Sequence, residues 1–238
     1  MATKSNHESM NALTLQSAEL CDCKRQVIGV THSLLTPGNL IANFFDLAVN
    51  ELIGLRTRAE IEAIEQAAVL ILECEARGGR VHVTGIGKSE YVARYIASLL
   101  SSTGTPAYFL NATESTHGSS GQVCRSDVTI AVSKSGATAE LMLAIDTLRE
   151  MGTKIIGISS DRTSSLAGAS DVFLHAAVNN EGGPLNLAPR TSVLANLYIL
   201  CALTVVLEAQ KGLTREQYAR WHPCGSLGRL ARGEYIKG

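Results

Sequence analysis

The segment best suited to chemistry is 133–140 (SKSGATAE), which combines hydroxyl groups, a glycine and a carboxylate. An apolar run, 127–132, precedes it and an amphipathic run, 141–151, follows it, so we expect the segment to join a strand to a helix. The free N–H groups and the positive end of such a helix favour an anion. The glycine lets the backbone approach a ligand closely. We interpret the segment as a phosphate-binding loop formed by Ser133, Ser135, Gly136 and Thr138.

Glu140 lies one turn inside the predicted helix, close enough to act on the molecule to which the phosphate is attached. A carboxylate in that place can serve as a general base. The alternative interpretation of the whole segment is an ordinary strand-to-helix turn, in which serine and threonine only cap the helix.

A second candidate is the glycine turn at 85–89 (GIGKS), which follows the apolar run 81–84. It lacks the spacing of a P-loop and of the dinucleotide-binding fingerprint, so neither an NTPase nor a dinucleotide site is predicted. A lysine at the start of a helix opposes the helix dipole and needs an anion or a carboxylate nearby. Gly87, Lys88 and Ser89 are therefore predicted to contact the ligand, with an ordinary exposed lysine as the alternative.

Three more titratable candidates lie in segments rich in glycine and small polar residues. His117 is either structural or part of a loop that lines the site. Glu181 follows the last predicted strand in an irregular loop, and is either simply exposed or a second acid–base carboxylate that partners Glu140. His222, on a glycine-rich turn near the C-terminus, is either an exposed surface residue without a functional role or a residue that reaches the cleft of a neighbouring subunit.

The pattern after residue 80 alternates apolar strands with amphipathic helices, which implies right-handed crossovers and a parallel sheet. The predicted strands are 81–84, 107–110, 127–132, 155–159 and 172–174. Ligands of such sheets bind beyond the carboxyl ends of the strands, so the glycine turn, the His117 segment and the phosphate loop should converge. Before the sheet, the sequence predicts helices at 13–30, 40–53 and 61–74, a turn at 36–39 and a capping box at 57–60.

Composition and charge exclude several classes of protein. The 238 residues carry a net charge of -1, with no basic excess for nucleic acid or an anionic membrane. The six cysteines lack the spacing of a disulfide framework or a zinc site, and we interpret the pair at 21–23 as having no metal role. The polar N-terminus is unlike a signal peptide, and 193–207 is too short to span a bilayer, so we expect a cytoplasmic protein with a buried core helix there.

Taken together, six motifs resemble the sugar isomerase (SIS) domain of D-arabinose 5-phosphate isomerases. They occur in the family's order: GIGKS at 85–89, STGTPA at 102–107, ExxHG at 114–118, SxSG at 133–136, ExxPLNLAP at 181–189 and HPxGxLGR at 222–229. The resemblance implies a three-layer α/β/α fold with a five-stranded parallel sheet in flavodoxin-like order and extra N-terminal helices. It also implies a homotetramer with sites at subunit contacts, built from a SIS domain at 40–238 after an N-terminal extension at 1–39.

The same resemblance implies an enzyme that interconverts D-ribulose 5-phosphate and D-arabinose 5-phosphate through a cis-enediol, without a metal or other cofactor. The family's functional positions fall on Lys88, His117, Glu140, Glu181 and His222. Either glutamate would move the proton between carbons, and Lys88 would stabilise charge on oxygen or orient the sugar. His222 would shuttle protons between oxygens or assist ring opening, and His117 would hold the hydrogen-bond geometry.

The sequence departs from the family pattern around the sugar, at Asn111-Ala112, Ser119, Gly182-Gly183, Arg190 and Cys224. These changes leave open an isomerase of another phosphosugar, and also a SIS module that only senses a phosphosugar. The sequence has no counterpart of the paired CBS modules that many members carry, so nucleotide control through those modules is not expected.

Overall fold

The computed structural model describes residues 36–234. The helix predicted at 13–30 and the cysteine pair at 21–23 lie outside these residues. The chain divides into two compact units, Met1–Asp46 and Leu47–Gly238, and the boundary falls inside helix α2 (Pro37–Arg58). The sheet, the helices that cover it and the candidate site all belong to the second unit.

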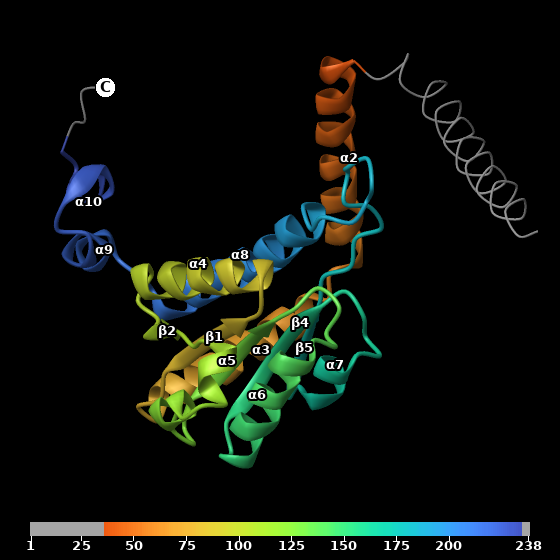
Figure 1. Cartoon of the computed structure of the whole chain (residues 1–238). Helices are drawn as coiled ribbons and strands as arrows, with labels where there is room; N and C mark the ends of the chain where they lie inside the picture. Colours follow the sequence, from red (N-terminus) through yellow and green to blue (C-terminus); the bar gives the residue numbers. More distant parts are fainter. Residues whose placement is uncertain (1–35, 235–238) are drawn as a thin grey trace, which may run out of the picture. The chain divides into compact units, whose positions relative to one another are not determined.

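A five-stranded sheet with the order β2-β1-β3-β4-β5 forms the centre of the second unit (Figure 1). All neighbouring strands in it are parallel. The strands are β1 (Val81–Gly85), β2 (Ala107–Phe109), β3 (Val128–Val132), β4 (Lys154–Ser159) and β5 (Val172–His175). The predicted flavodoxin-like order is confirmed, and each predicted strand differs from the observed one by a single residue.

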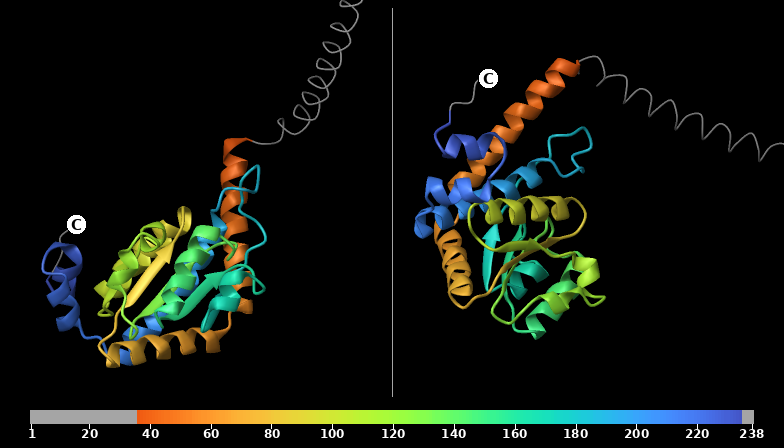
Figure 2. Two further views of the ribbon diagram at one scale, coloured as in Figure 1. Left: turned by 60° about the horizontal axis from the view of Figure 1, so that its bottom comes forward. Right: turned by 90° about the vertical axis from the view of Figure 1, so that its left-hand side faces the viewer.

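Helices cover both faces of this sheet and give the predicted three-layer α/β/α fold (Figure 2). One face carries α3 (Ile61–Ala76), α4 (Lys88–Ser102) and α8 (Thr191–Lys211). The other face carries α5 (Ala112–Ser115), α6 (Ala139–Glu150) and α7 (Ser165–Ala169). The remaining elements are the 3-10 helix η1 (Ser119–Gln122) and the helices α9 (Arg215–Trp221) and α10 (Gly225–Ala231).

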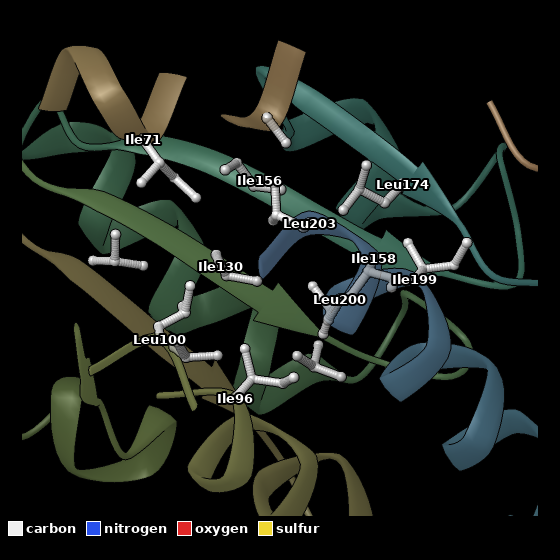
Figure 3. Close-up of a cluster of buried hydrophobic side chains, with 14 of the residues drawn as sticks. Ile71, Ile96, Leu100, Ile130, Ile156, Ile158, Leu174, Ile199, Leu200 and Leu203 are labelled. Atoms are coloured by element: carbon white, nitrogen blue, oxygen red, sulfur yellow. The ribbon is translucent and has the colours of Figure 1, made fainter. Parts of the chain in front are cut away.

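The sequences of the strands are nearly continuous apolar runs because their side chains form the core on both faces of the sheet. Successive strand residues point to opposite faces, and both faces are buried because helices cover both. On the face of α3, α4 and α8, Ile130 and Ile156 share one cluster with Leu200 and Leu203 (Figure 3). Truncating such a side chain to alanine typically costs about 2–5 kcal/mol. This packing fixes the carboxyl ends of the strands, and with them the loops that carry the candidate residues.

Helix α8 is a long, apolar element of this layer. Within residues 36–234, it is the one helix that could cross a membrane as judged by length and composition alone. In the fold it packs against α3 and α4, and Ile199, Leu200 and Leu203 on it are buried. The prediction of a core helix at 193–207 is therefore confirmed.

Two local predictions before the sheet are wrong. Pro37 begins α2, so residues 37–39 of the predicted turn at 36–39 are helical instead. A proline suits the first helical position, where its missing N–H would have no partner in any case. The Thr57 hydroxyl donates to the Gly54 carbonyl inside α2, so the predicted capping box does not form. Helix α3 instead starts after Glu60 without any side-chain cap.

Candidate functional site

A cavity of about 250 Å³ opens at the carboxyl edge of the sheet, where β1 leads into α4, β3 leads into α6, and α8 begins. Five of the predicted residues line it: Lys88, Ser89, Ser133, Ser135 and Thr138. The N-terminal ends of three helices meet there, and such ends attract anions. Among the residues that the structure describes, no three His, Cys, Asp or Glu side chains gather as they would around a metal ion.

The loop after β3 is shaped by its own hydrogen bonds. The Ser133 hydroxyl accepts the Gly136 N–H (2.9 Å), and the Ser135 hydroxyl accepts the Ala137 N–H (3.3 Å). Gly136 has a φ of +68°, and a Cβ there would overlap the Ser164 side chain, so glycine is required. Ser133 is buried whereas Ser135 is exposed. The first serine therefore braces the loop, and the second presents its hydroxyl at the cavity.

Helix α6 presents an uncapped start to this cavity. Thr138 is its N-cap residue, but the Thr138 side chain forms no capping hydrogen bond. Its hydroxyl and the first N–H groups of the helix are therefore available to a ligand. Glu140 lies in the first turn of the same helix and is exposed. Glu140 does not itself line the cavity, but it follows Thr138, which does, by two residues.

The glycine turn after β1 places Lys88 and Ser89 at the start of α4. Gly87, just before them, has a φ of +62°, a conformation that favours glycine. A Cβ on Gly85 would lie 2.8 Å from the Ser89 carbonyl oxygen and 2.9 Å from that of Val132. Both glycines are therefore needed for the sharp turn that brings the lysine to the cavity.

Glu181 is buried behind the cavity wall rather than exposed in its loop, with 2% of its surface accessible. Its Oε1 lies 2.6 Å from the Nζ atom of Lys134. The Lys134 side chain is 44% exposed, and it lines the cavity. One lysine thus connects the cavity to a buried carboxylate. Lys134 was missed in the sequence, although it stands between the two serines of the phosphate loop.

The other oxygen of Glu181 caps helix α8. Its Oε2 accepts the N–H groups of Arg190 (2.6 Å) and Ser192 (3.2 Å). Burial alone would raise the pKa of this carboxyl, but Lys134 and the groups of Ser192 and Arg190 outweigh burial and lower the pKa to about 2. Glu181 is therefore charged at neutral pH and satisfies the start of α8. The starts of α4 and α6 remain for a ligand.

The loop that carries Glu181 has no regular structure, yet it is firmly held. The buried carboxylate of Glu51, on α2, accepts the N–H groups of Asn179 and Asn180, each at 3.0 Å. The side chain of Asn186 accepts the N–H of Glu181 itself (2.6 Å). These contacts fix the position of Glu181 in the way that strand pairing would fix a residue in a sheet.

Two buried polar residues of α8 face the cavity and were missed in the sequence. Ser192 and Asn196 are 2% and 3% exposed, and both line the cavity. Within residues 36–234, no hydrogen bond of good geometry reaches the Ser192 hydroxyl oxygen, although the hydroxyl lies near enough to the Glu181 carboxylate to help lower its pKa. A buried hydroxyl without a partner is costly, so it is normally satisfied by a ligand or water. The surrounding sequence is so apolar that it indicates only a core helix.

The two candidate histidines do not line the cavity of their own chain. His117 is exposed, just after α5. His222 ends α9, where its ring stacks on Tyr218 with the centroids 4.0 Å apart. Its Nδ1 donates to the Tyr218 carbonyl oxygen (2.9 Å), which leaves Nε2 as the acceptor of the neutral ring. Gly225 begins α10, so the glycine-rich turn predicted around His222 is partly helical.

The length of α8 separates His222 from the cavity. Its first turn lines the cavity, and its 21 residues span about 30 Å. Helix α9 follows the far end of α8, and its Trp221 lies against Gly104, in the turn between α4 and β2. His222 therefore lies away from the cavity in this chain.

Known proteins are similar to this chain in both sequence and fold. Residues 76–206 match the family model of the SIS domain. Arabinose 5-phosphate isomerase KdsD of Pseudomonas aeruginosa is 42% identical over 151 residues, which are 63% of this chain and 46% of that protein. The KdsD of Francisella tularensis is 38% identical over 185 residues, which are 78% of this chain and 56% of that protein. The chain thus spans about half the length of the curated relatives it matches.

A solved structure of an Escherichia coli protein, in complex with a sugar phosphate, has a TM-score of 0.74 to this chain at 30% identity. The similarity covers 79% of this chain and all of the other. The family match includes more than half of the chain and every residue that lines the cavity, from Ile86 to Asn196. The chain therefore belongs to the SIS domain family.

Proposed function

We propose that this chain is a sugar-phosphate isomerase, and that D-ribulose 5-phosphate and D-arabinose 5-phosphate are its substrate pair. One observation carries the proposal: two uncapped helix starts and two lysines meet in a cavity, with Glu181 paired to one of these lysines and Glu140 in the first turn of one of these helices. The helix starts suit a phosphate, and the glutamates suit proton transfer. The curated relatives, named arabinose 5-phosphate isomerases, support a pentose as the sugar.

The proposed reaction moves one hydrogen between two carbons through a cis-enediol. A base takes a proton from C1 of the ketose and returns it to C2, while the hydroxyl proton of O1 moves to O2. Lys88 stabilises the negative charge that develops on oxygen in between. The acid, the base and the electrostatic stabiliser are all side chains, so no cofactor takes part in the proposed reaction.

Glu140 and Glu181 are the two candidates for this base, and their surroundings differ. Glu140 is exposed, in the first turn of α6. Glu181 is buried and paired with Lys134. Both belong to the site in our proposal, with His117 holding the hydrogen-bond geometry at its rim.

We place the phosphate at Ser135, Thr138 and the start of α6, and the carbon chain along α8. There the Ser192 hydroxyl and the Asn196 side chain would pair with hydroxyl groups of the sugar. The buried Ser192 oxygen, which no hydrogen bond of good geometry reaches from the described residues, supports this orientation, because a sugar hydroxyl would satisfy it.

We also propose a cytoplasmic homotetramer, formed by a SIS domain at 40–238 with residues 1–39 as an extension. In it, His222 of a neighbouring copy would complete each site and shuttle protons between the oxygens. Exposed apolar side chains on α4 and α8 support such an assembly: Tyr91, Tyr95, Tyr198 and Val205. Burying them between copies is favourable at roughly 25 cal/mol per Å².

A panel of pentose, hexose and heptose phosphates, assayed after EDTA treatment, tests the proposal. We expect interconversion of the two pentose phosphates without added metal. The panel includes the larger sugars because Asn111 and Gly183 depart from the family pattern around the sugar. Turnover of only a hexose or heptose phosphate would change the substrate, and tight binding without turnover would identify a phosphosugar sensor instead.

A further inference from the structure

Lys134 lies between two negative groups, one built into the protein and one that the cavity would bind. We propose that Lys134 moves its ion pair from Glu181 to the phosphate of the substrate, and so makes Glu181 reactive only when the phosphate loop is occupied. The inference rests on the proposed function for the identity of the anion. It assigns Lys134 as a positioning residue that acts through Glu181.

The backbone of Lys134 is held by hydrogen bonds, whereas its side chain is partly exposed. The N–H and the hydroxyl of Ser160 both donate to the Lys134 carbonyl oxygen, at 3.0 and 2.7 Å. The side chain is 44% exposed and already lines the cavity, with Ser133 and Ser135 on either side of it in the chain. A lysine has a flexible four-carbon stem, so its ammonium group can change partner without any movement of the loop.

Among the described residues, Lys134 is the one charged side chain in contact with Oε1 of Glu181. Apart from the ion pair, Oε1 accepts no hydrogen bond from the residues that the structure describes. The other oxygen stays bound to the N–H groups of Arg190 and Ser192 whether or not Lys134 is paired. Departure of Lys134 therefore leaves Oε1 as an unpaired carboxylate oxygen in a buried place.

A buried, unpaired carboxylate takes up protons more readily, because burial disfavours its charged form. With Lys134 in place, the pKa of Glu181 is about 2, which makes the group a weak base at neutral pH. The bound phosphate would add its own negative charge and raise the pKa further. Among the described residues, Arg190 donates its N–H to the other oxygen, Glu51 accepts the N–H of the neighbouring Asn180, and Lys88 lines the same cavity; none of these groups forms a hydrogen bond or ion pair with Oε1.

The sharpest test supplies the sugar and the anion as two separate molecules. A pentose without its phosphate should be isomerised slowly, and added phosphite should accelerate the reaction by about tenfold or more if anion binding activates the site. Lys134→Gln should lose most of this phosphite activation, and Lys134→Arg should retain it. Lys154→Gln is the matched control, because Lys154 forms a 2.6 Å ion pair with Asp171 at the surface. Undiminished phosphite activation in Lys134→Gln would overturn the proposal.

A binding experiment keeps this inference separate from the proposed function. Sulfate carries no titratable proton at about pH 4, so proton uptake on sulfate binding, measured by calorimetry in several buffers, reports on the protein. The wild type should take up protons, while Glu181→Gln should not and Lys134→Gln should do so less. Sulfate binding without proton uptake contradicts the coupling. Proton uptake in a protein that isomerises no sugar phosphate supports the coupling and refutes only the proposed function.

Discussion

Glu181 experiences two opposing effects, since burial disfavours its charge while Lys134 and the start of α8 favour it. The net result is a pKa lowered from 4.5 to about 2. A carboxyl with a lowered native pKa stabilises the fold above its unfolded pKa, and this contribution disappears as the pH falls through the native pKa. The shift corresponds to about 3 kcal/mol at neutral pH.

The pH dependence of stability should therefore change when this carboxyl is removed. Between about pH 5 and pH 2, the free energy of unfolding of the wild type should fall more steeply than that of Glu181→Gln. Urea denaturation of both proteins at a series of pH values measures the two slopes. Equal slopes would show that Glu181 is not held as a charged group.

Replacing either candidate base should affect turnover. Glu140→Gln and Glu181→Gln should each lower kcat by roughly 10²–10⁴-fold, the usual contribution of an acid–base group. Asp171→Asn, a change in a carboxylate paired with Lys154 at the surface, should leave kcat unchanged. Full activity in both glutamine variants would contradict the mechanism.

Replacing Ser192 should affect the activity of the enzyme but not the stability of its fold. Its hydroxyl is buried and forms no hydrogen bond of good geometry with the described residues, so Ser192→Ala should leave the unfolding free energy unchanged or raise it. The same change should lower kcat/KM by about tenfold, because a hydrogen bond to the sugar is lost. Steady-state kinetics and thermal unfolding on one preparation check both results. A destabilised variant with normal kinetics would place the hydroxyl in the core rather than in the site.

At the scale of elements, the loop between β3 and α6 is the most constrained part of the site. Gly136→Ala should destabilise the fold by about 1–3 kcal/mol and weaken phosphate binding, because the new Cβ meets Ser164 at a positive φ. Gly168→Ala in α7 is the control, since no atom lies within 4 Å of its Cβ position. That change should be neutral or stabilise by up to about 1 kcal/mol. Thermal unfolding and phosphate titration measure the stability and the phosphate affinity of the two variants. Equal stability and equal affinity would contradict the prediction.

The helices and strands of the sheet could be predicted from the sequence because their hydrophobic patterns are local and repeat along the chain. Apolar strands such as 128–132 alternate with amphipathic helices, and that alternation alone predicts a parallel sheet with its ligand edge. The prediction failed where a helix includes the residues of a short motif. Thr57 continues α2 rather than capping α3, and Gly225 begins a helix rather than a turn.

Only some of the site residues could be predicted from the sequence. Lys88, Ser135 and Thr138 follow strands directly, so topology places them at the cavity. The pairing of Lys134 with Glu181 depends on the path of an irregular loop, which no periodicity encodes. Ser192 was missed for the opposite reason, because it lies on a helix whose apolar pattern conceals a polar face.

At the scale of the whole molecule, His222 decides whether the site is shared between copies. In one chain it stands at the far end of α8 from the cavity. If a neighbouring copy supplies it, inactive Glu140→Gln and inactive His222→Asn should regain activity when they are unfolded together and reassembled, because some sites then contain both native residues. Mixing two folded, separately assembled variants is the control. No recovery after reassembly into the normal oligomer would place His222 outside the site.

The central claim is that carboxylates move a hydrogen along a carbon chain that is anchored by its phosphate. The most direct measurement follows D-ribulose 5-phosphate by NMR in deuterated water, with EDTA present and with Glu140→Gln and Glu181→Gln in parallel. The account predicts D-arabinose 5-phosphate with solvent deuterium at C2, formed far more slowly by both variants. Absence of any isomerised product from the panel of sugar phosphates, or undiminished deuterium exchange in both variants, would contradict it.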